Sequence, residues 1–427
     1  MTVTIFMVSL LGAILAGVPI AFALLLCGLA LMIHLDIFDA QVMAQNLVGG
    51  ANSFPLLAIP FFVLAGEIMN AGGLSRRIVD LPMKLVGHKA GGLGFVAVIA
   101  AMIMASLSGS AVADTAAVGA LLIPMMRRAN YPVGRSAGLI AAGGIIAPII
   151  PPSIPFIIFG VASGLSISRL FMAGIVPGVM MGAALMSVWW WQARHLDLPR
   201  APRATRDELI NSLRESIWAL LLPVIIIGGF RSGIFTPTEA GVVAAFYALF
   251  VALFVYRGMR LMDIYPILVA AARTTAVVMF LVAAAQVSAW LITYAELPLM
   301  VSDLLAPLID SPRVLLFVVM LAIMVIGMVM DLTPTVLILT PVLMPLIKTA
   351  GIDPIHFGVL FIVNASIGLI TPPVGNVLNV ITGVAQMRFD EAARGVLPYV
   401  ATHLGVLLLL MLVPEFVTLP LRWLMPN

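Results

Sequence analysis

Long apolar runs make up nearly all of this chain, and they constrain its fold more than any other feature. A helix that crosses a bilayer needs roughly 20 apolar residues, and runs of about this length or longer fill most of the 427 residues. Hydrophobic residues make up 62% of the chain and charged residues only 10%, which lies outside the range of soluble globular domains. We therefore expect an all-α polytopic membrane protein in which residues 1–427 form a single membrane unit.

Composition also excludes several classes of function. The lone Cys27 excludes an intramolecular disulfide, and no cluster of Cys and His has the spacing of metal ligands. The net charge of +3 comes from arginines scattered in short loops between apolar runs, where the bias of positive charge toward the cytoplasm accounts for them. We expect the lipid bilayer as a partner and no nucleic acid.

Loop charge predicts how the first half of the chain crosses the membrane. The segments 75–89 and 127–135, and the loop with five arginines between 194 and 214, are all basic, which places them in the cytoplasm. The run 93–126 lies between the first two, so it must enter and leave on the same side, as a re-entrant hairpin with "SLSGS" at its tip. The run 136–164 then crosses once, interrupted by "PIIPPSIP".

The second half of the chain predicts the same elements in the opposite orientation. An acidic loop at 296–312 lies outside, and the run 314–347 enters from there as a second hairpin. The run 356–386, broken at "TPPVGN", returns to the cytoplasm. The first run, 3–34, is ambiguous, because it fits either one long helix kinked at Gly17 to Pro19 or two spans.

A shift of 221 residues relates the two halves, since it lays Pro124 on Pro345 and the pair Pro151 and Pro152 on Pro372 and Pro373. The first hairpin enters from the cytoplasm and the second from outside, so the repeats are inverted. Inverted repeats with broken helices at mid-membrane are typical of the binding site of a secondary transporter. We expect repeat cores at 93–192 and 314–386, a linker loop with scaffold helices at 193–313, and further scaffold helices at 1–71 and 397–427.

The broken helices indicate what this site binds. A break leaves unpaired N–H groups, which attract anions, and unpaired carbonyl groups, which coordinate cations. Further oxygen ligands of the kind that an alkali cation prefers come from Ser106, Ser108, Ser110, Thr371 and Asn376.

Two carboxylates lie within the hairpin sequences, Asp114 and Asp331. Each either belongs to a polar cavity or braces its hairpin through backbone N–H groups. The shift places Ser110 and Asp331 at equivalent points, so we expect the two ion sites to differ in charge.

The residues argue against an enzyme. An intramembrane serine protease would need a buried histidine as its base, and only His403 lies inside an apolar run. We therefore expect no catalytic residues and no cofactor other than a coupling cation.

The motifs "SLSGSAVADTAAVGALLIPMM", "PIIPPSIPFIIFGV", "GIFTPTEAG" and "DLTPTVLILTPVLMPL" show that the chain resembles, end to end, the large membrane subunit of tripartite ATP-independent periplasmic (TRAP) transporters. The resemblance is strongest to the branch that carries the sugar acid 2,3-diketo-L-gulonate. It implies an elevator-type fold like that of the ion transporter superfamily, in a bacterial inner membrane. It also implies sodium-driven uptake of an organic acid, a small TRAP membrane subunit and a periplasmic substrate-binding protein. A self-sufficient ion-coupled carboxylate carrier is the alternative.

The resemblance further implies which residues hold sodium and substrate, through hydroxyls and carbonyls at each hairpin tip and at the helix break that faces it. In the first repeat these are Ser106, Ser108, Gly109, Ser110, Ala147, Ile150 and Pro152. In the second repeat they are Gly327, Asp331, Gly368, Thr371, Pro373 and Asn376.

Overall fold

The computed structural model describes residues 2–196, 198–200 and 202–425, and every regular element in them is a helix. Positions 1, 197, 201, 426 and 427, which the predicted unit includes, lie outside the described residues. Seven helical segments of these residues are long and apolar enough to cross a membrane, so the expected all-α polytopic class is confirmed. These segments are Phe54–Ala71, Ile167–Ala193, Arg206–Arg231, Pro237–Val255, Leu261–Tyr294, Leu332–Thr349 and Phe389–Leu412.

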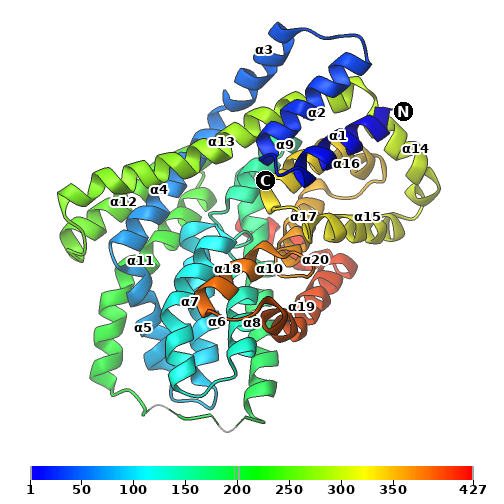
Figure 1. The fold of residues 1–427 in the computed structure, drawn as a ribbon. Helices are drawn as coiled ribbons and strands as arrows, with labels where there is room; N and C mark the ends of the chain where they lie inside the picture. Colours follow the sequence, from blue (N-terminus) through cyan, green and yellow to red (C-terminus); the bar gives the residue numbers. More distant parts are fainter. Residues whose placement is uncertain (1, 197, 201, 426–427) are drawn as a thin grey trace.

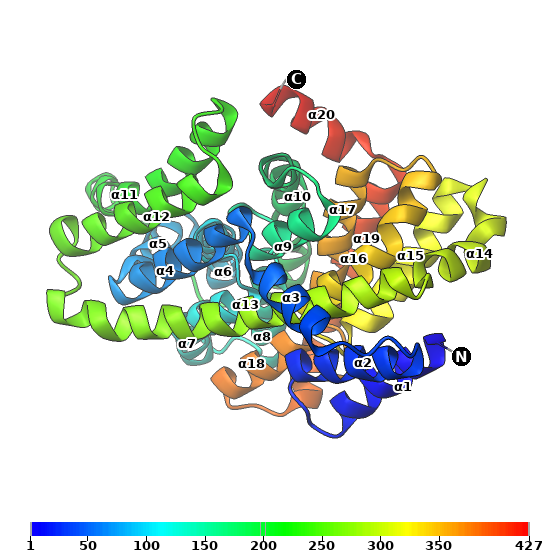
Figure 2. The ribbon, with the colours of Figure 1, turned by 90° about the horizontal axis from the view of Figure 1, so that it is seen from above.

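The helices form two groups that meet along one long helix, α13 (Ile264–Tyr294). Figures 1 and 2 show one group on the left, in which α4 packs on α12 and α5 on α11. These four are α4 (Ala58–Ala71), α5 (Leu74–Val86), α11 (Arg206–Arg231) and α12 (Pro237–Phe250). Helix α13 contacts α4 at one part of its length and α16 (Leu332–Thr349) at another, so it joins the two groups.

The second group holds two helical hairpins and two broken helices. Helices α6 (Gly92–Ser108) and α7 (Ala111–Arg128) pack together around a turn at Gly109 and Ser110, and α15 (Pro312–Gly327) and α16 form the second pair. One broken helix consists of α8 (Val133–Gly144) and α9 (Ile154–Ser163), and the other of α17 (Pro354–Gly368) and α18 (Asn376–Ala385). The side of the membrane from which each hairpin enters stays a prediction.

The helix bounds follow the shift that relates the prolines. Shifted by 221, the bounds 111 and 128 of α7 become 332 and 349, which are the bounds of α16. The first residue of α8, 133, becomes 354, which is the first residue of α17. The same local signals, a small or polar tip and a proline-marked break, therefore begin and end helices at matching points in both halves.

Two segments predicted as loops are helices. The basic segment 75–89 largely forms α5, which packs on α6 and α11, and the acidic segment 296–312 largely forms α14 (Leu297–Ile309), which packs on α16. In α5 the apolar side chains of Leu74, Ile78 and Leu81 are buried, at helical spacing. Prediction from charge alone missed this amphipathic pattern.

The first run, for which the sequence left two arrangements open, is two helices packed on each other, α1 (Thr2–Leu15) and α2 (Ile20–His34), and not one kinked helix. An unpredicted helix follows, α3 (Ala40–Ala51), capped by Asp39, which accepts hydrogen bonds from the N–H groups of Gln41 and Val42.

The C-terminal helices contact both repeat cores. They are α19 (Phe389–Leu412) and α20 (Glu415–Leu424), and both pack against α10 (Ile167–Ala193), while α19 also packs against α8. The assignment of residues 397–427 to the scaffold stays a prediction, and the described part of this segment contacts the repeat cores. Helices α10 and α19 are equivalent in the two repeats, because the shift of 221 carries the bounds 167 and 193 of α10 to 388 and 414, close to the bounds of α19.

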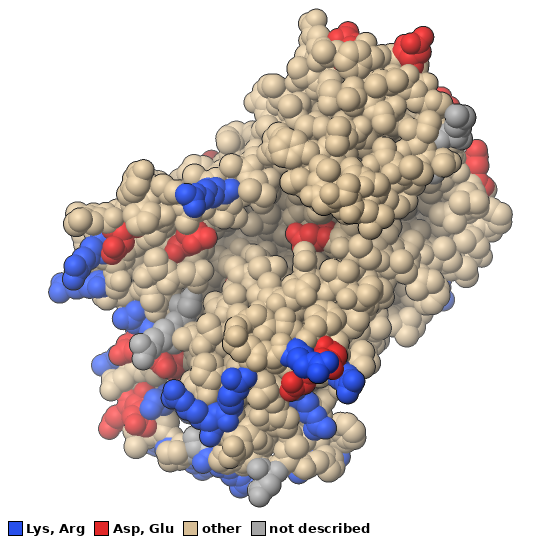
Figure 3. Space-filling model, in the orientation of Figure 1, with Lys and Arg blue, Asp and Glu red and all other residues tan. Residues whose placement is uncertain are grey.

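Positively charged side chains gather toward one end of the molecule. Figure 3 shows that Lys and Arg lie mainly in the lower part of the view, where α5, α7 and the loop after α10 end. Cationic side chains are retained on the cytoplasmic side of membrane proteins, so this end of the molecule is predicted to face the cytoplasm.

This orientation predicts a labelling pattern for single cysteines. The one natural thiol, Cys27, is fully buried, so it should give little background. We expect cysteines at the exposed positions Arg200 and Asp303 to react with an impermeant maleimide from opposite sides, Arg200→Cys from the cytoplasm and Asp303→Cys from outside. Permeabilised cells serve as the control in which both react, and reaction of Arg200→Cys in intact spheroplasts would contradict the assignment.

Candidate functional site

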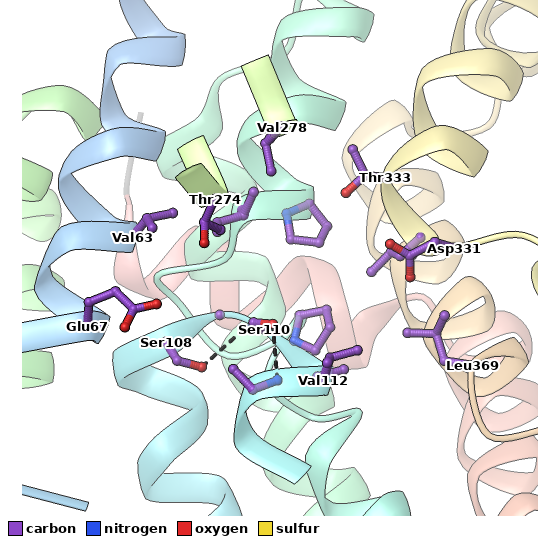
Figure 4. Close-up of a pocket in the computed structure, with 18 of the residues that line it drawn as sticks. Val63, Glu67, Ser108, Ser110, Val112, Thr274, Val278, Asp331, Thr333 and Leu369 are labelled. Atoms are coloured by element: carbon purple, nitrogen blue, oxygen red, sulfur yellow. Dashed lines mark hydrogen bonds between the residues drawn. The ribbon is translucent and has the colours of Figure 1, made fainter. Parts of the chain in front are cut away.

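A cavity of about 310 Å³ lies where the two hairpin tips face each other (Figure 4). The first tip contributes residues 108–113 and the second Asp331, Leu332 and Thr333. The helix breaks contribute Pro148, Ile154, Pro155 and Leu369. Helices of the other group close the remaining wall with Val63, Gly66, Glu67 and Asn70 from α4 and Thr274 and Val278 from α13. The cavity is therefore shared by both repeats and by the helices on which they pack.

Local hydrogen bonds hold the first tip. Gly109 ends α6 in the left-handed conformation, with φ of 62°, which glycine adopts at little cost. The Ser108 hydroxyl accepts a hydrogen bond from the Ser110 N–H at 3.1 Å, and the Ser110 hydroxyl caps α7 by accepting one from the Ala113 N–H at 3.3 Å. Ser106 is buried and donates to the Ile103 carbonyl at 2.6 Å. These bonds fix the serine oxygens at the tip.

The first helix break wraps around this tip. A Cβ on Gly109 would lie 2.7 Å from the carbonyl oxygen of Pro152, and one on Gly144 would meet the side chain of Thr115 in α7. Among the described residues, no group donates a hydrogen bond to the carbonyl oxygens of Ala147, Ile150 or Pro152. Unpaired carbonyls beside a tip that carries hydroxyls are the ligand set that a hard cation such as sodium takes.

The second tip rests on the second break in the same way. A Cβ on Gly368 would lie 2.7 Å from the carbonyl oxygen of Gly327, so the two backbones touch. The Gly375 N–H donates to the Met328 carbonyl at 3.3 Å, and the Thr371 hydroxyl donates to the Ile367 carbonyl at 2.8 Å. The bond between the paired prolines is cis in this break, as it is in the first.

Asp331 is at the start of α16, in the position where a side chain caps a helix, yet its carboxylate accepts no capping hydrogen bond. Figure 4 shows it beside Thr333, across the cavity from Glu67 and Ser108. The carboxylate of Asp331 therefore faces the cavity without the capping bond that a bracing role would use. Pro373 and Asn376, by contrast, are exposed and do not line the cavity.

Asp114 is placed differently from Asp331. It lies in the first turn of α7, with 1% of its surface exposed, and it does not line the cavity. Its Oδ1 accepts the hydroxyl proton of Ser108, and its Oδ2 has no partner among the described residues. Asp114 therefore lies directly behind the tip.

Helix N-termini, and no cationic side chain, bring positive partial charge to the cavity, which the carboxylates Glu67 and Asp331 also line. Three helices begin at its wall, α7 with residues 111–113, α9 with Ile154 and Pro155, and α16 with Leu332 and Thr333. Each helix N-terminus carries a partial positive charge of about half an elementary charge, and none of the described lining residues is Lys or Arg. The site is suited to an anion that shares the cavity with small cations.

Some lining residues were not predicted from the sequence. None of Glu67, Asn70, Thr274 and Thr333 is among the site residues predicted from the sequence, yet all four line the cavity. The first three come from α4 and α13, outside the repeat cores, so only the packing of the two groups brings them to the site. An isolated Glu within an apolar run was the one available signal.

Comparisons with known proteins agree with this geometry. The family model of the tripartite ATP-independent periplasmic transporter, DctM component, matches residues 7–416. The 2,3-diketo-L-gulonate TRAP transporter large permease protein YiaN of Escherichia coli K12 is 73% identical over 423 residues, which cover 99% of this chain and 100% of the relative. The sialic acid TRAP transporter large permease protein SiaM of Vibrio cholerae is 41% identical, covering 96% of each chain.

Among solved structures, the YdaH transporter of Alcanivorax borkumensis superposes with a TM-score of 0.66. The match covers 90% of this chain and 91% of that one at 16% identity. At this identity the likeness concerns the fold alone, and the fold is that of a membrane transporter.

Proposed function

Because the chain belongs to the DctM component family of tripartite ATP-independent periplasmic transporters, we propose that it is the large permease of a sodium-coupled system that imports an organic acid. The preferred substrate class is a sugar acid such as 2,3-diketo-L-gulonate, the substrate in the name of the E. coli relative. Permeases of this family are multi-pass inner-membrane transporters and not enzymes. A small TRAP membrane subunit and a periplasmic substrate-binding protein complete the proposed system.

One observation carries the proposal, which is that three helix N-termini, hydroxyl and amide groups and the two carboxylates Glu67 and Asp331 surround a cavity whose described wall has no Lys or Arg. N-terminal N–H groups bind carboxylates, and hydroxyl and amide groups suit the hydroxyls of a sugar. A volume of about 310 Å³ lies at the lower end of small-molecule sites. A compact organic acid fits this space.

Sodium is the proposed coupling ion because of the ligands around the tips. The first repeat offers Ser106, Ser108 and three unpaired carbonyls, and the second offers Gly327, Asp331, Gly368 and Thr371. We place the substrate between the two ions, so that each ion adds positive charge where the anion binds.

The proposed transport step is an elevator-like movement of the repeat cores along α13. Thr274 and Val278 of this helix line the central cavity, and Ala285, Ala289 and Thr293 line a second cavity between α13, α9 and α16. Arg127 at the end of α7 donates to the carbonyl of Ala385 at the end of α18 at 2.6 Å, which ties the first hairpin to the second broken helix. Both features support movement of the two repeat cores as one body.

A sodium gradient should therefore be required for uptake. We expect reconstituted vesicles that contain the chain, its small subunit and binding protein to accumulate substrate with inward sodium, and uptake to fall to background in choline at matched membrane potential. The inward-negative potential itself adds ~2.3 kcal/mol per net positive charge per 100 mV, so it must be held constant.

The same vesicles distinguish the alternative function. A self-sufficient ion-coupled carboxylate carrier would accumulate substrate without the binding protein and the small subunit. Equal uptake in choline and in sodium would contradict both forms of the proposal.

A further inference from the structure

Asp114 raises a question that the proposed sodium sites do not answer. A carboxylate with 1% of its surface exposed and one oxygen without a partner is costly, because a buried charge needs a compensating charge or a full set of hydrogen bonds. The position of Asp114 in the first turn of α7 helps through the helix dipole. That contribution is small compared with the cost of burying a charge.

No side chain nearby offers the compensating charge. The helices packed against α7 are α6, α8 and α18, and Arg135 is the only Lys, Arg or His on them. It lies nine residues before Gly144, the α8 residue that meets α7 beside Asp114, which is roughly 14 Å along the helix. The arginines of α7 itself are at its opposite end. The missing partner is therefore not a residue of these helices.

The hydrogen bonds of Ser108 show where a cation would complete the arrangement. Its hydroxyl donates its only proton to Asp114 and accepts the N–H of Ser110 at 3.1 Å. One lone pair of the Ser108 oxygen remains, and the next residue, Gly109, packs against the unpaired carbonyl of Pro152 in the first break. A carboxylate behind a ligand both fixes the orientation of that ligand and makes it a better donor of electrons.

Building on the proposed sodium coupling, we propose that Asp114 is the positioning residue of the first sodium site. It holds the Ser108 hydroxyl with its lone pair toward the ion and gives a negative charge to a site whose ligands are all neutral. This changes the expectation from the repeat that the two sites differ in charge. The second site has Asp331 at its tip, and the first has Asp114, which acts through its hydrogen bond with the tip residue Ser108.

Sodium binding can be measured without transport. We expect sodium, and not choline, to raise the melting temperature of the purified full chain in lipid nanodiscs, because a ligand that binds only the folded state stabilises it. In Asp114→Asn, which keeps the shape and an acceptor for Ser108, we expect the sodium concentration at half-maximal stabilisation to rise on the order of tenfold, the lower end of the effect of removing a group that orients a metal ligand. Asp303→Asn, on the exposed face of α14, is the matched control and should leave the midpoint unchanged.

A double-mutant cycle tests whether Asp114 acts through Ser108. We expect the sodium midpoint of the double variant Asp114→Asn, Ser108→Ala to lie close to that of Ser108→Ala alone, because the effects of residues that act as a unit are not additive. The fold-increase in the midpoint caused by Asp114→Asn should multiply with the fold-increase caused by Asp331→Asn, which belongs to the other site. Independent effects of Asp114→Asn and Ser108→Ala would overturn the assignment.

The outcomes separate this inference from the proposed function. Absence of any sodium-specific stabilisation of the unmodified chain contradicts sodium coupling itself. A normal response of the unmodified chain with an unchanged midpoint in Asp114→Asn contradicts only the role of Asp114. If Asp114→Asn does not fold, Asp114→Glu decides, since the retained charge predicts a midpoint within about twofold of the unmodified chain, and a shift as large as that of Ser108→Ala overturns the proposal.

Discussion

Replacing Gly368 with Ala should reduce sodium-driven uptake by roughly tenfold or more. The added methyl group would lie 2.7 Å from the carbonyl oxygen of Gly327 and would also meet its Cα, and backbone atoms cannot rotate out of the way as a flexible side chain can. Overpacking of this kind typically costs about 1–3 kcal/mol. Because the contact joins the second tip to its break, the strain moves the proposed ligands Gly368 and Thr371 apart from Gly327.

Substitutions at two further glycines test whether the loss of uptake follows the closeness of the contact. A Cβ on Gly327 would lie 3.3 Å from the Ala365 carbonyl, and one on Gly383 would meet nothing within 4 Å. We expect uptake per folded protein to decrease in the order Gly383→Ala, Gly327→Ala, Gly368→Ala, with Gly383→Ala close to the unmodified chain. Uptake is measured against the amount of folded protein in the membrane, and equal uptake by all three variants would refute the close-contact argument.

Replacing Asp331 with Asn should raise the sodium concentration for half-maximal uptake by roughly tenfold or more, which corresponds to ~1.4 kcal/mol. At an effective dielectric constant of about 20, two unit charges 4 Å apart attract by about 4 kcal/mol before the cost of desolvation. The Asp331 side chain makes no capping bond, so the substitution removes charge from the cavity without weakening the start of α16.

Ser110→Ala is the natural comparison, because the two positions are equivalent under the shift. Its hydroxyl caps α7, and loss of such a cap costs about 1 kcal/mol of stability. We expect less folded protein in Ser110→Ala but a nearly unchanged sodium midpoint. If Asp331→Asn behaves in the same way, Asp331 is a structural residue and does not bind the ion.

The tips and breaks could be predicted from the sequence, because prolines, glycines and hydroxyls are conspicuous in apolar runs and recur at a constant shift. Helices α5 and α14 could not be recognised from charge, since their polar faces resemble loops and their apolar faces matter only after they pack. The group to which α19 belongs follows from the same shift, but only when the shift is applied to whole helices and not to prolines alone.

The site itself was only partly predictable. Backbone ligands at the breaks follow from local sequence, whereas Glu67 and Thr274 reach the cavity from α4 and α13 through tertiary packing. The hydrogen bond between Ser108 and Asp114 joins two residues that are six apart in sequence, on either side of the turn. Its existence depends on the left-handed conformation of Gly109, which the composition of the tip permits but does not require.

The lack of a cationic side chain in the described cavity wall has a consequence for how tightly the proposed transporter couples its two gradients. An arginine in the wall would hold the anion whether or not sodium were present, and the carrier could then return loaded and let the acid escape. If mobile ions supply the charge instead, the anion and sodium must strengthen each other's binding by the same factor. Leakage is then suppressed by the same attraction that drives accumulation, and no separate gate is needed to enforce fidelity.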